Sequence, residues 1–128
     1  MKFMFTIYHD DKVMDAMPEQ ERRALVDSAI EYAEDIRRSG HYILSNALQR
    51  PQTARTIRVR AGNVSTAAGP FAETKEQLGG FFVIEAKDMD EACAIAARFP
   101  PARVAVIEVR PVEELKHSRD RRGLPKPR

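Results

Sequence analysis

The densest cluster of charged side chains in this 128-residue chain lies in the segment GPFAETKEQ, residues 69–77. A carboxylate beside an ammonium group in an enclosed loop could act as a proton-transfer base, which makes Glu73 and Lys75 catalytic candidates. The alternative is that alternating charges hold the loop through ion pairs and backbone hydrogen bonds. Gly and Pro in sequence favour a turn, and we expect the Phe that follows to anchor the loop in the core. The ligand-binding candidates from this loop are Gly69, Pro70, Phe71, Glu73, Thr74 and Lys75.

A second group with chemical potential is Tyr8-His9-Asp10, at the end of a predicted strand. An imidazole can exchange protons near neutral pH, so His9 is a further catalytic candidate. Adjacent strand residues point to opposite faces, so His9 and Asp10 can cooperate only where the strand has ended. The alternative is that His9 is an exposed loop residue. Tyr8 is kept as a ligand-binding candidate.

Charged residues also lie within predicted strands. Arg58 or Arg110 could bind a carboxylate or phosphate through two parallel hydrogen bonds, so both are ligand-binding candidates. The alternative is that Arg58, Arg60, Glu108 and Arg110 pair across strands.

Several chemistries are not expected. Three scattered His residues and one Cys predict no metal site, and Cys93 is expected as a small core residue of a helix. The sequence has no GxGxxG or GxxxxGK[ST] phosphate loop and no GxSxG nucleophile elbow. We therefore expect no cofactor.

Composition indicates one ordinary domain, with 43% hydrophobic and 31% charged residues. A single Cys cannot form an internal disulfide, and no apolar run reaches the ~20 residues of a membrane helix. We expect a cytoplasmic protein with no membrane contact. Residues 115–128 hold six Lys and Arg against Asp120, whereas the remainder holds 15 against 18 Asp and Glu. This basic tail is interpreted as a disordered end, and the acidic body argues against a function in nucleic-acid binding.

The hydrophobic pattern predicts a β-α-β unit, a hairpin, and a second β-α-β unit. Strands are expected at 3–8, 41–48, 55–60, 64–66, 81–84 and 104–109, with a tight turn at Gly62-Asn63. Helices are expected from Pro18 to Gly40 and from Asp88 to Phe99. This order predicts an α+β, ferredoxin-like fold with both helices on one face of an antiparallel sheet. The other face needs a cover, so we expect a homodimer with a central cleft.

The chain resembles the YCII-related, DGPF-motif family. The resemblance rests on four segments: MKFMFTIY, ALQRPQTARTIRVRAG, GPFAETKEQLGGFFVIEAKDMDEACAIAARFP and IEVRPV. It implies a ferredoxin-like domain over residues 1–112, which leaves residues 113–128 as the basic tail that the composition indicates. It further implies a dimeric α/β barrel in a bacterial setting, sometimes near sigma-factor regulators, with no established reaction for most members.

The sequence departs from this family at informative positions. The signature Asp is replaced by Ala68, and Phe99 precedes Pro100 where one branch has a suspected catalytic Asp. That branch also has a suspected catalytic His early in the first helix, where this chain has Arg22-Arg23-Ala24-Leu25. These departures favour a small-ligand-binding or regulatory module. The alternatives are a cofactor-free lyase, isomerase or hydrolase, and a protein-interaction partner that uses the basic tail.

Overall fold

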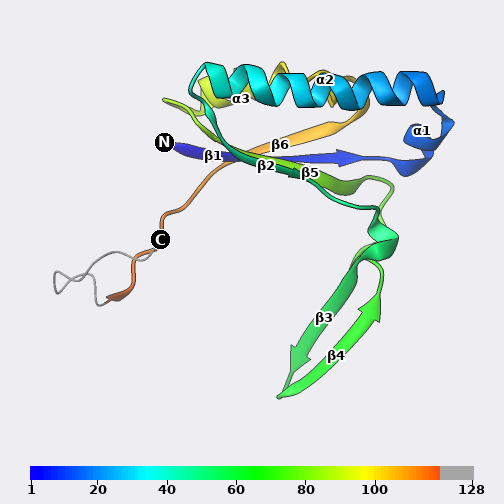
Figure 1. The fold of residues 1–128 in the computed structure, drawn as a ribbon. Coiled ribbons are helices and arrows are strands. Elements are labelled where there is room, and N and C mark those ends of the chain that lie inside the picture. The colour runs from blue at the N-terminus through cyan, green and yellow to red at the C-terminus, as the bar shows by residue number, and fades with distance from the viewer. Residues whose placement is uncertain (119–128) are drawn as a thin grey trace.

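The computed structural model describes residues 1–118 (Figure 1). The elements in chain order are β1 (Lys2–His9), α1 (Asp11–Ala16), α2 (Glu19–Arg38), β2 (Tyr42–Ala47), the 3₁₀ turn η1 (Pro51–Thr53), β3 (Arg55–Arg60), β4 (Asn63–Ala68), β5 (Gln77–Glu85), α3 (Met89–Ala97), the 3₁₀ turn η2 (Pro100–Val104) and β6 (Val106–Pro111). Within the described residues, no helix is long and apolar enough to cross a membrane.

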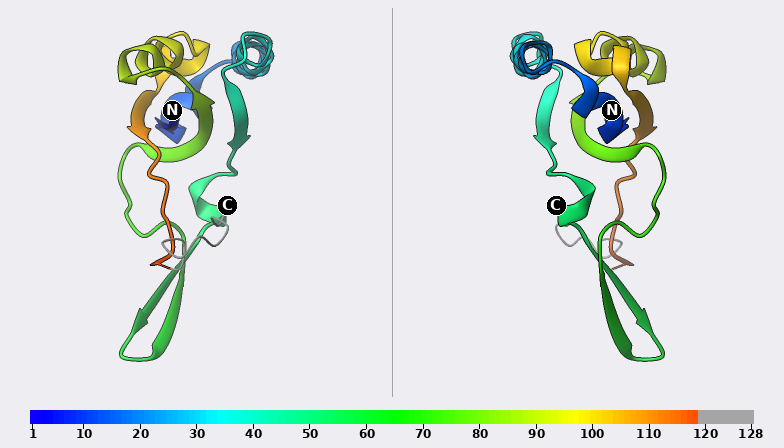
Figure 2. Two further views of the ribbon diagram at one scale, coloured as in Figure 1. Left: turned by 90° about the vertical axis from the view of Figure 1, so that its left-hand side faces the viewer. Right: turned by 90° about the vertical axis from the view of Figure 1, so that its right-hand side faces the viewer.

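The main sheet has four strands in the order β2-β5-β1-β6, and every neighbouring pair is antiparallel. Helices α2 and α3 lie together over one face of this sheet (Figures 1 and 2). The predicted α+β, ferredoxin-like fold is thus confirmed. Strands β3 and β4 form a separate two-stranded sheet that projects from the side opposite the helices.

The core lies between the helices and the sheet, and strand alternation builds it. Phe3 and Phe5 of β1 are at most 1% exposed, whereas the intervening Met4 faces away and is half-buried. Phe5 stacks on Phe82 of β5 with ring centroids 4.8 Å apart. Tyr32 of α2 packs edge-on against Phe82, and its hydroxyl donates to the Ile95 carbonyl at 2.6 Å. These contacts join both helices to the central strands.

The helix starts differ from prediction at the N-terminal end. A short helix, α1, follows β1 directly, because the Asp10 side chain accepts from the backbone N–H of Lys12 at 2.9 Å. This helix was missed in the sequence, since six residues are too few to show a helical period. Met17 consequently ends α1, and Pro18 is the N-cap of α2 without a side-chain hydrogen bond. Gly40 terminates α2 as expected, with φ of +85°.

Two other predictions on element details were wrong. The hairpin turn is Ala61-Gly62 rather than Gly62-Asn63, because Arg60 pairs with Asn63 and both central residues have positive φ. Cys93 is exposed on α3, since the buried face of that helix is formed by Ala92, Ile95 and Ala96.

The sheet face opposite the helices carries many apolar side chains that the described chain leaves partly open. Register places alternate residues of all four strands on it. We call this surface the open face: Met4, Thr6, Tyr8, Leu44, Asn46, Leu78, Phe81, Val83, Val106, Glu108 and Arg110.

Candidate functional site

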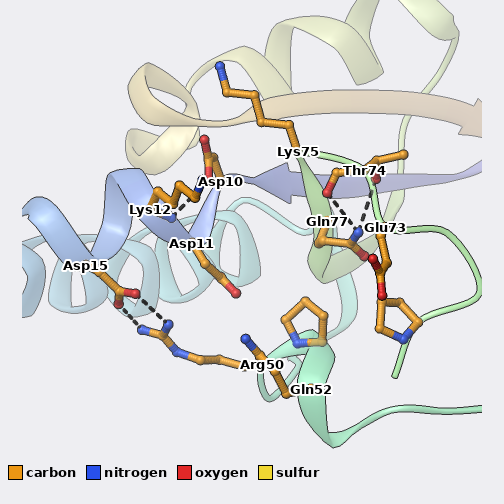
Figure 3. A pocket seen from close by; sticks show the side chains of 12 residues that line it. Asp10, Asp11, Lys12, Asp15, Arg50, Gln52, Glu73, Thr74, Lys75 and Gln77 are labelled. Atoms are coloured by element: carbon orange, nitrogen blue, oxygen red, sulfur yellow. Dashed lines mark hydrogen bonds and ion pairs between the residues drawn. The ribbon is translucent and has the colours of Figure 1, made fainter. Parts of the chain in front are cut away.

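A cleft of ≈ 600 Å³ lies where three segments meet: the β1–α1 junction, η1 and the loop of residues 69–77 (Figure 3). We call it the charged cleft. Its lining residues are Asp10, Asp11, Lys12, Asp15, Arg50, Pro51, Gln52, Pro70, Glu73, Thr74, Lys75 and Gln77. Four of the loop candidates from the sequence, Pro70, Glu73, Thr74 and Lys75, therefore line one cleft.

The loop is held by neutral groups. The Gln77 side-chain amide donates to the carbonyls of Ala72 and Thr74 at 2.8 and 3.0 Å, and the Thr74 hydroxyl donates to the Glu76 carbonyl at 2.7 Å. Of the alternative that charges hold this loop, the backbone hydrogen bond of Thr74 is present, whereas Glu73, Lys75 and Glu76 form no ion pair within residues 1–118. Figure 3 shows Lys75 extending away from the Asp15–Arg50 pair. Charged groups of this loop are thus available to a ligand.

The opposite wall of the cleft is fixed by an ion pair. Arg50 donates two hydrogen bonds to the Asp15 carboxylate, at 2.5 and 3.1 Å. These bonds lower the pKa of Asp15 and keep its carboxylate charged. Asp10 is engaged in capping α1, whereas Asp11 points toward the space between the two walls (Figure 3).

Phe71 does not anchor the loop in the core, because its side chain is 80% exposed. The chain leaves the hairpin through Gly69, which has φ of +90°. Gly69 is tied to the base of the hairpin: its N–H donates to the Ala54 carbonyl at 2.7 Å, and its carbonyl accepts from the Thr56 hydroxyl at 2.9 Å. The polar bonds of Thr74 and Gln77 already hold the loop, which leaves Phe71 on the surface.

His9 lies at the corner where β1 ends. Its Nδ1 is buried without a hydrogen bond and faces Asp11 Oδ1 at 3.7 Å, so the partner suggested by the structure is Asp11 and not Asp10. No residue in 1–118 forms a hydrogen bond with Nε2. The β1–β5 register shifts at this point, between Ile7 and Tyr8. A Cβ on Gly79 would lie 2.1 Å from His9 Nε2, so the imidazole occupies the space that a side chain at Gly79 would take.

His9 also borders a second space, on the helix side of the sheet. This hollow of ≈ 580 Å³ lies between α2, η2 and strands β2 and β5. Its lining is mainly apolar and includes Leu25, Ala29, Phe82 and Phe99. Leu25 and Phe99 are 6% and 5% exposed. Phe99 stands before Pro100, and Leu25 belongs to the stretch of residues 22–25 where the resemblance would lead one to look for a His. Both give the hollow an apolar wall.

The remaining candidates from the sequence lie elsewhere. Tyr8 and Arg110 are on the open face, where Arg110 bonds to Glu108 of the same strand at 3.1 Å. Arg58 is exposed on β3 of the projecting hairpin. These three residues are therefore not brought to the charged cleft within one chain.

Sequence reasoning missed Asp11, Arg50, Gln77 and Gly79. The signal for Asp11 was weak, because only the neighbouring Asp10 was considered as a partner of His9. Arg50 and Asp15 are 35 residues apart in the chain, and no local pattern connects them. Gly79 could have been recognised as a bulge signal, since a Gly inside a strand pattern often marks one.

Comparison with known proteins gives a family and a fold. The model of the YCII-related domain matches residues 1–116. An uncharacterised protein, R00369, of Rhizobium meliloti (strain 1021) is 44% identical over 61 residues, which is 46% of this chain; the match spans about half of that relative, 49%.

A structural relative is 5-chloro-2-hydroxyhydroquinone dehydrochlorinase (TftG) from Burkholderia phenoliruptrix AC1100, solved with 2,5-dihydroxybenzoquinone. It superimposes with a TM-score of 0.53 at 15% identity, covering 89% of this chain and 95% of the other. This likeness supports the fold, and the domain model matches nearly the full described length. The chain belongs to the YCII-related domain family.

Proposed function

We propose that this chain is a small-ligand-binding module whose ligand lies at the corner formed by His9 and Asp11. The apolar part of the ligand occupies the hollow under α2, and its polar end meets His9 and the side chains of the charged cleft. Glu73, Thr74 and Lys75, which line the charged cleft, are the loop residues assigned to that polar end.

The observation that carries this proposal is the unsatisfied imidazole beside a mainly apolar hollow. Ligand pockets are typically apolar spaces of ~300–1,000 Å³ with a few converging polar groups, and the hollow of ≈ 580 Å³ falls in that range. A carboxylate facing Nδ1 favours the proton there, which leaves Nε2 as an acceptor. The ligand is therefore a compact apolar molecule with a hydroxyl group. The structural relative TftG, solved with a hydroxylated quinone, supports this class.

Binding of hydroxylated aromatic compounds, including 2,5-dihydroxybenzoquinone, tests the proposal by calorimetry and by NMR shifts of residues around the hollow. We expect His9→Gln to weaken binding by about tenfold, the value of one hydrogen bond of ~1.4 kcal/mol. His41→Gln is the matched control, because His41 is partly exposed at the entry to β2, and its affinity should stay within about twofold. Equal affinities in the wild type and His9→Gln, or shifts confined to other surfaces, would overturn the site.

A second candidate function is cofactor-free acid–base catalysis at the same corner. It is favoured by the orientation of His9 Nδ1 toward Asp11, which leaves Nε2 to take a proton from a bound hydroxyl group. Turnover of a bound compound should then fall in His9→Gln and Asp11→Asn, and stay in Glu76→Gln, whose residue does not line the cleft. Loss of turnover in a folded Glu73→Ala variant would instead assign the base to the loop.

We also propose that the protein is a cytoplasmic homodimer in which the open faces of two copies cover each other. Val106, Leu44 and Leu78 on that face are 50%, 41% and 40% exposed. The same face of a second copy would bury this apolar surface on both copies. Interaction through the basic tail remains a hypothesis, because residues 119–128 lie outside the described part of the chain.

A further inference from the structure

The hairpin β3–β4 stands away from the rest of the described chain (Figures 1 and 2). Every residue of its two strands is exposed except Thr56, which is half-buried. A two-stranded hairpin on its own is at best marginally stable in water. Its ordered pairing over six residue pairs therefore calls for a contact that one copy does not provide.

The two sides of the hairpin differ in chemistry. Cross-strand pairing puts Ile57, Val59 and Val64 on one side, and their exposed fractions are 65%, 55% and 67%. Arg58 and Arg60 lie on the other side, with Ser65 and Asn63 opposite them. Alternation of apolar and polar side chains is the pattern of a strand pair that covers a hydrophobic surface. The apolar side of the hairpin is thus suited to pack against another hydrophobic surface.

The placement of the hairpin points to a second copy of this chain as that surface. The hairpin projects on the same side as the open face, past which it extends (Figure 1). A copy that docks on the open face would therefore meet the hairpin, and twofold symmetry would give it the reciprocal contact.

Charge supports the same partner. Residues 54–72 hold Arg55, Arg58 and Arg60 and no acidic residue, whereas the rest of residues 1–118 holds 13 Lys and Arg against 18 Asp and Glu. Arg58 and Arg60 lie on the side of the hairpin opposite to Ile57, Val59 and Val64. The basic arm of one copy and the acidic body of another therefore attract each other at long range rather than through pairs inside the contact.

We propose that β3–β4 is a dimerisation arm: the hairpin of each copy lies with its Ile57–Val59–Val64 side on the partner, beside the partner's open face. The inference rests on the proposed homodimer and adds to it a second contact region formed by a separate part of the chain.

The central test changes the apolar side of the hairpin and preserves the pairing of β3 with β4. In V59K/V64E the two positions face each other directly, so the new charges attract across the strands and the hairpin persists. Sedimentation equilibrium should give a dimer dissociation constant raised by about tenfold or more, the value of ~1.4 kcal/mol. The control S65E/A67K adds the same charges to the opposite side and should change the constant by less than about threefold.

Further variants separate the arm from the dimer. V106K, on the open face, should weaken the dimer whether or not the hairpin takes part. If V106K weakens it and V59K/V64E does not, the homodimer stands and the arm is wrong. A wild type that is monomeric at all concentrations overturns both.

A photo-crosslinking amino acid at Val64 gives a readout independent of stability. We expect covalent dimers in which the adduct maps to residues of the partner rather than to the same chain, by mass spectrometry of mixed isotope-labelled protein. Adducts found only within one chain would contradict the arm.

Discussion

The two faces of the main sheet are formed by the same strands but differ in burial: helices cover one face, and the other is partly exposed. Along β1, Phe3 and Phe5 are sealed under α2 and α3, whereas Met4 and Tyr8 on the other face are only half-buried. On the helix side, aromatic rings interlock with centroid distances from 4.8 to 6.3 Å. On the other side, the open face is partly exposed and the strands of the hairpin are almost entirely exposed. The comparison separates what stabilises one copy from what is available for binding.

Both faces are apolar, so apolar character alone does not identify the core. Burial follows the position of the two helices, which connect strands through crossovers on a single side. Stability of one copy should therefore respond to substitutions on the helix side and be nearly insensitive to those on the other side. The following substitutions compare the sealed helix side with the corner at His9 and with the exposed loop of residues 69–77.

The largest effect is expected for Phe82→Ala. Phe82 is 6% exposed and lies in ring contact with Phe5, Tyr32, Tyr42 and Phe99. Removing such a ring loses its transfer free energy and leaves a cavity, which costs ~3–5 kcal/mol. Urea denaturation of the variant and the wild type at one protein concentration measures the difference. A loss below ~1 kcal/mol would show that this face is not the main source of stability.

Tyr32→Phe tests a buried side-chain hydrogen bond within that core. The variant lacks the bond to the Ile95 carbonyl and should lose ~1 kcal/mol. Burial raises the pKa of Tyr32 to about 12, whereas an unfolded tyrosine ionises near pH ~10. The folded state thus favours the neutral hydroxyl, and its contribution is complete below pH ~10 and is lost as the pH rises through about 12.

The pH dependence of the free energy of unfolding checks this assignment. Between pH ~10 and about 12 the wild type should lose more stability than Tyr32→Phe. Parallel curves for the two proteins would mean that the hydroxyl is not responsible.

Gly79 lies beside His9 in the β1–β5 pair. The effect of Gly79→Ala on stability should depend on whether His9 is present. The added Cβ would meet His9 Nε2 at 2.1 Å, so the imidazole must leave its rotamer, at a loss of ~0.5–1.5 kcal/mol. In a His9→Ala background the clash is gone, and the same substitution should stabilise by ~0.4–1 kcal/mol because it restricts the unfolded chain. A double-mutant cycle by thermal unfolding measures the coupling; additive effects would contradict the placement of His9.

The smallest effect is expected for Phe71→Ala. An 80% exposed ring contributes little to one copy, so the free energy of unfolding should change by less than ~0.5 kcal/mol. Unfolding should be followed at protein concentrations low enough to keep the chain monomeric. A loss comparable to that of Phe82→Ala would restore the expectation that Phe71 anchors the loop in the core.

Local pattern was enough for most of the fold. Alternation in β1, the Gly40 stop of α2 and the Asp88 cap of α3 are visible in the sequence, because each depends on residues within one or two turns. The candidate site was harder to predict from the sequence. Pro70, Glu73, Thr74 and Lys75 lie together in a cleft of a single chain, and their part in ligand binding stays a prediction. Phe71 was assigned to the core and is exposed.

By itself the sequence determined the order of the six strands and the two longer helices, the antiparallel sheet and its two apolar faces, since these follow from short-range periodicity and turn residues. Only the tertiary structure decided which face is sealed, that His9 faces Asp11 over Gly79, and that Asp15 meets Arg50 across 35 residues. The physical reason is the sequence separation over which each effect acts. Backbone preferences act between neighbouring residues, whereas burial and charge pairing depend on how segments distant in the sequence pack together.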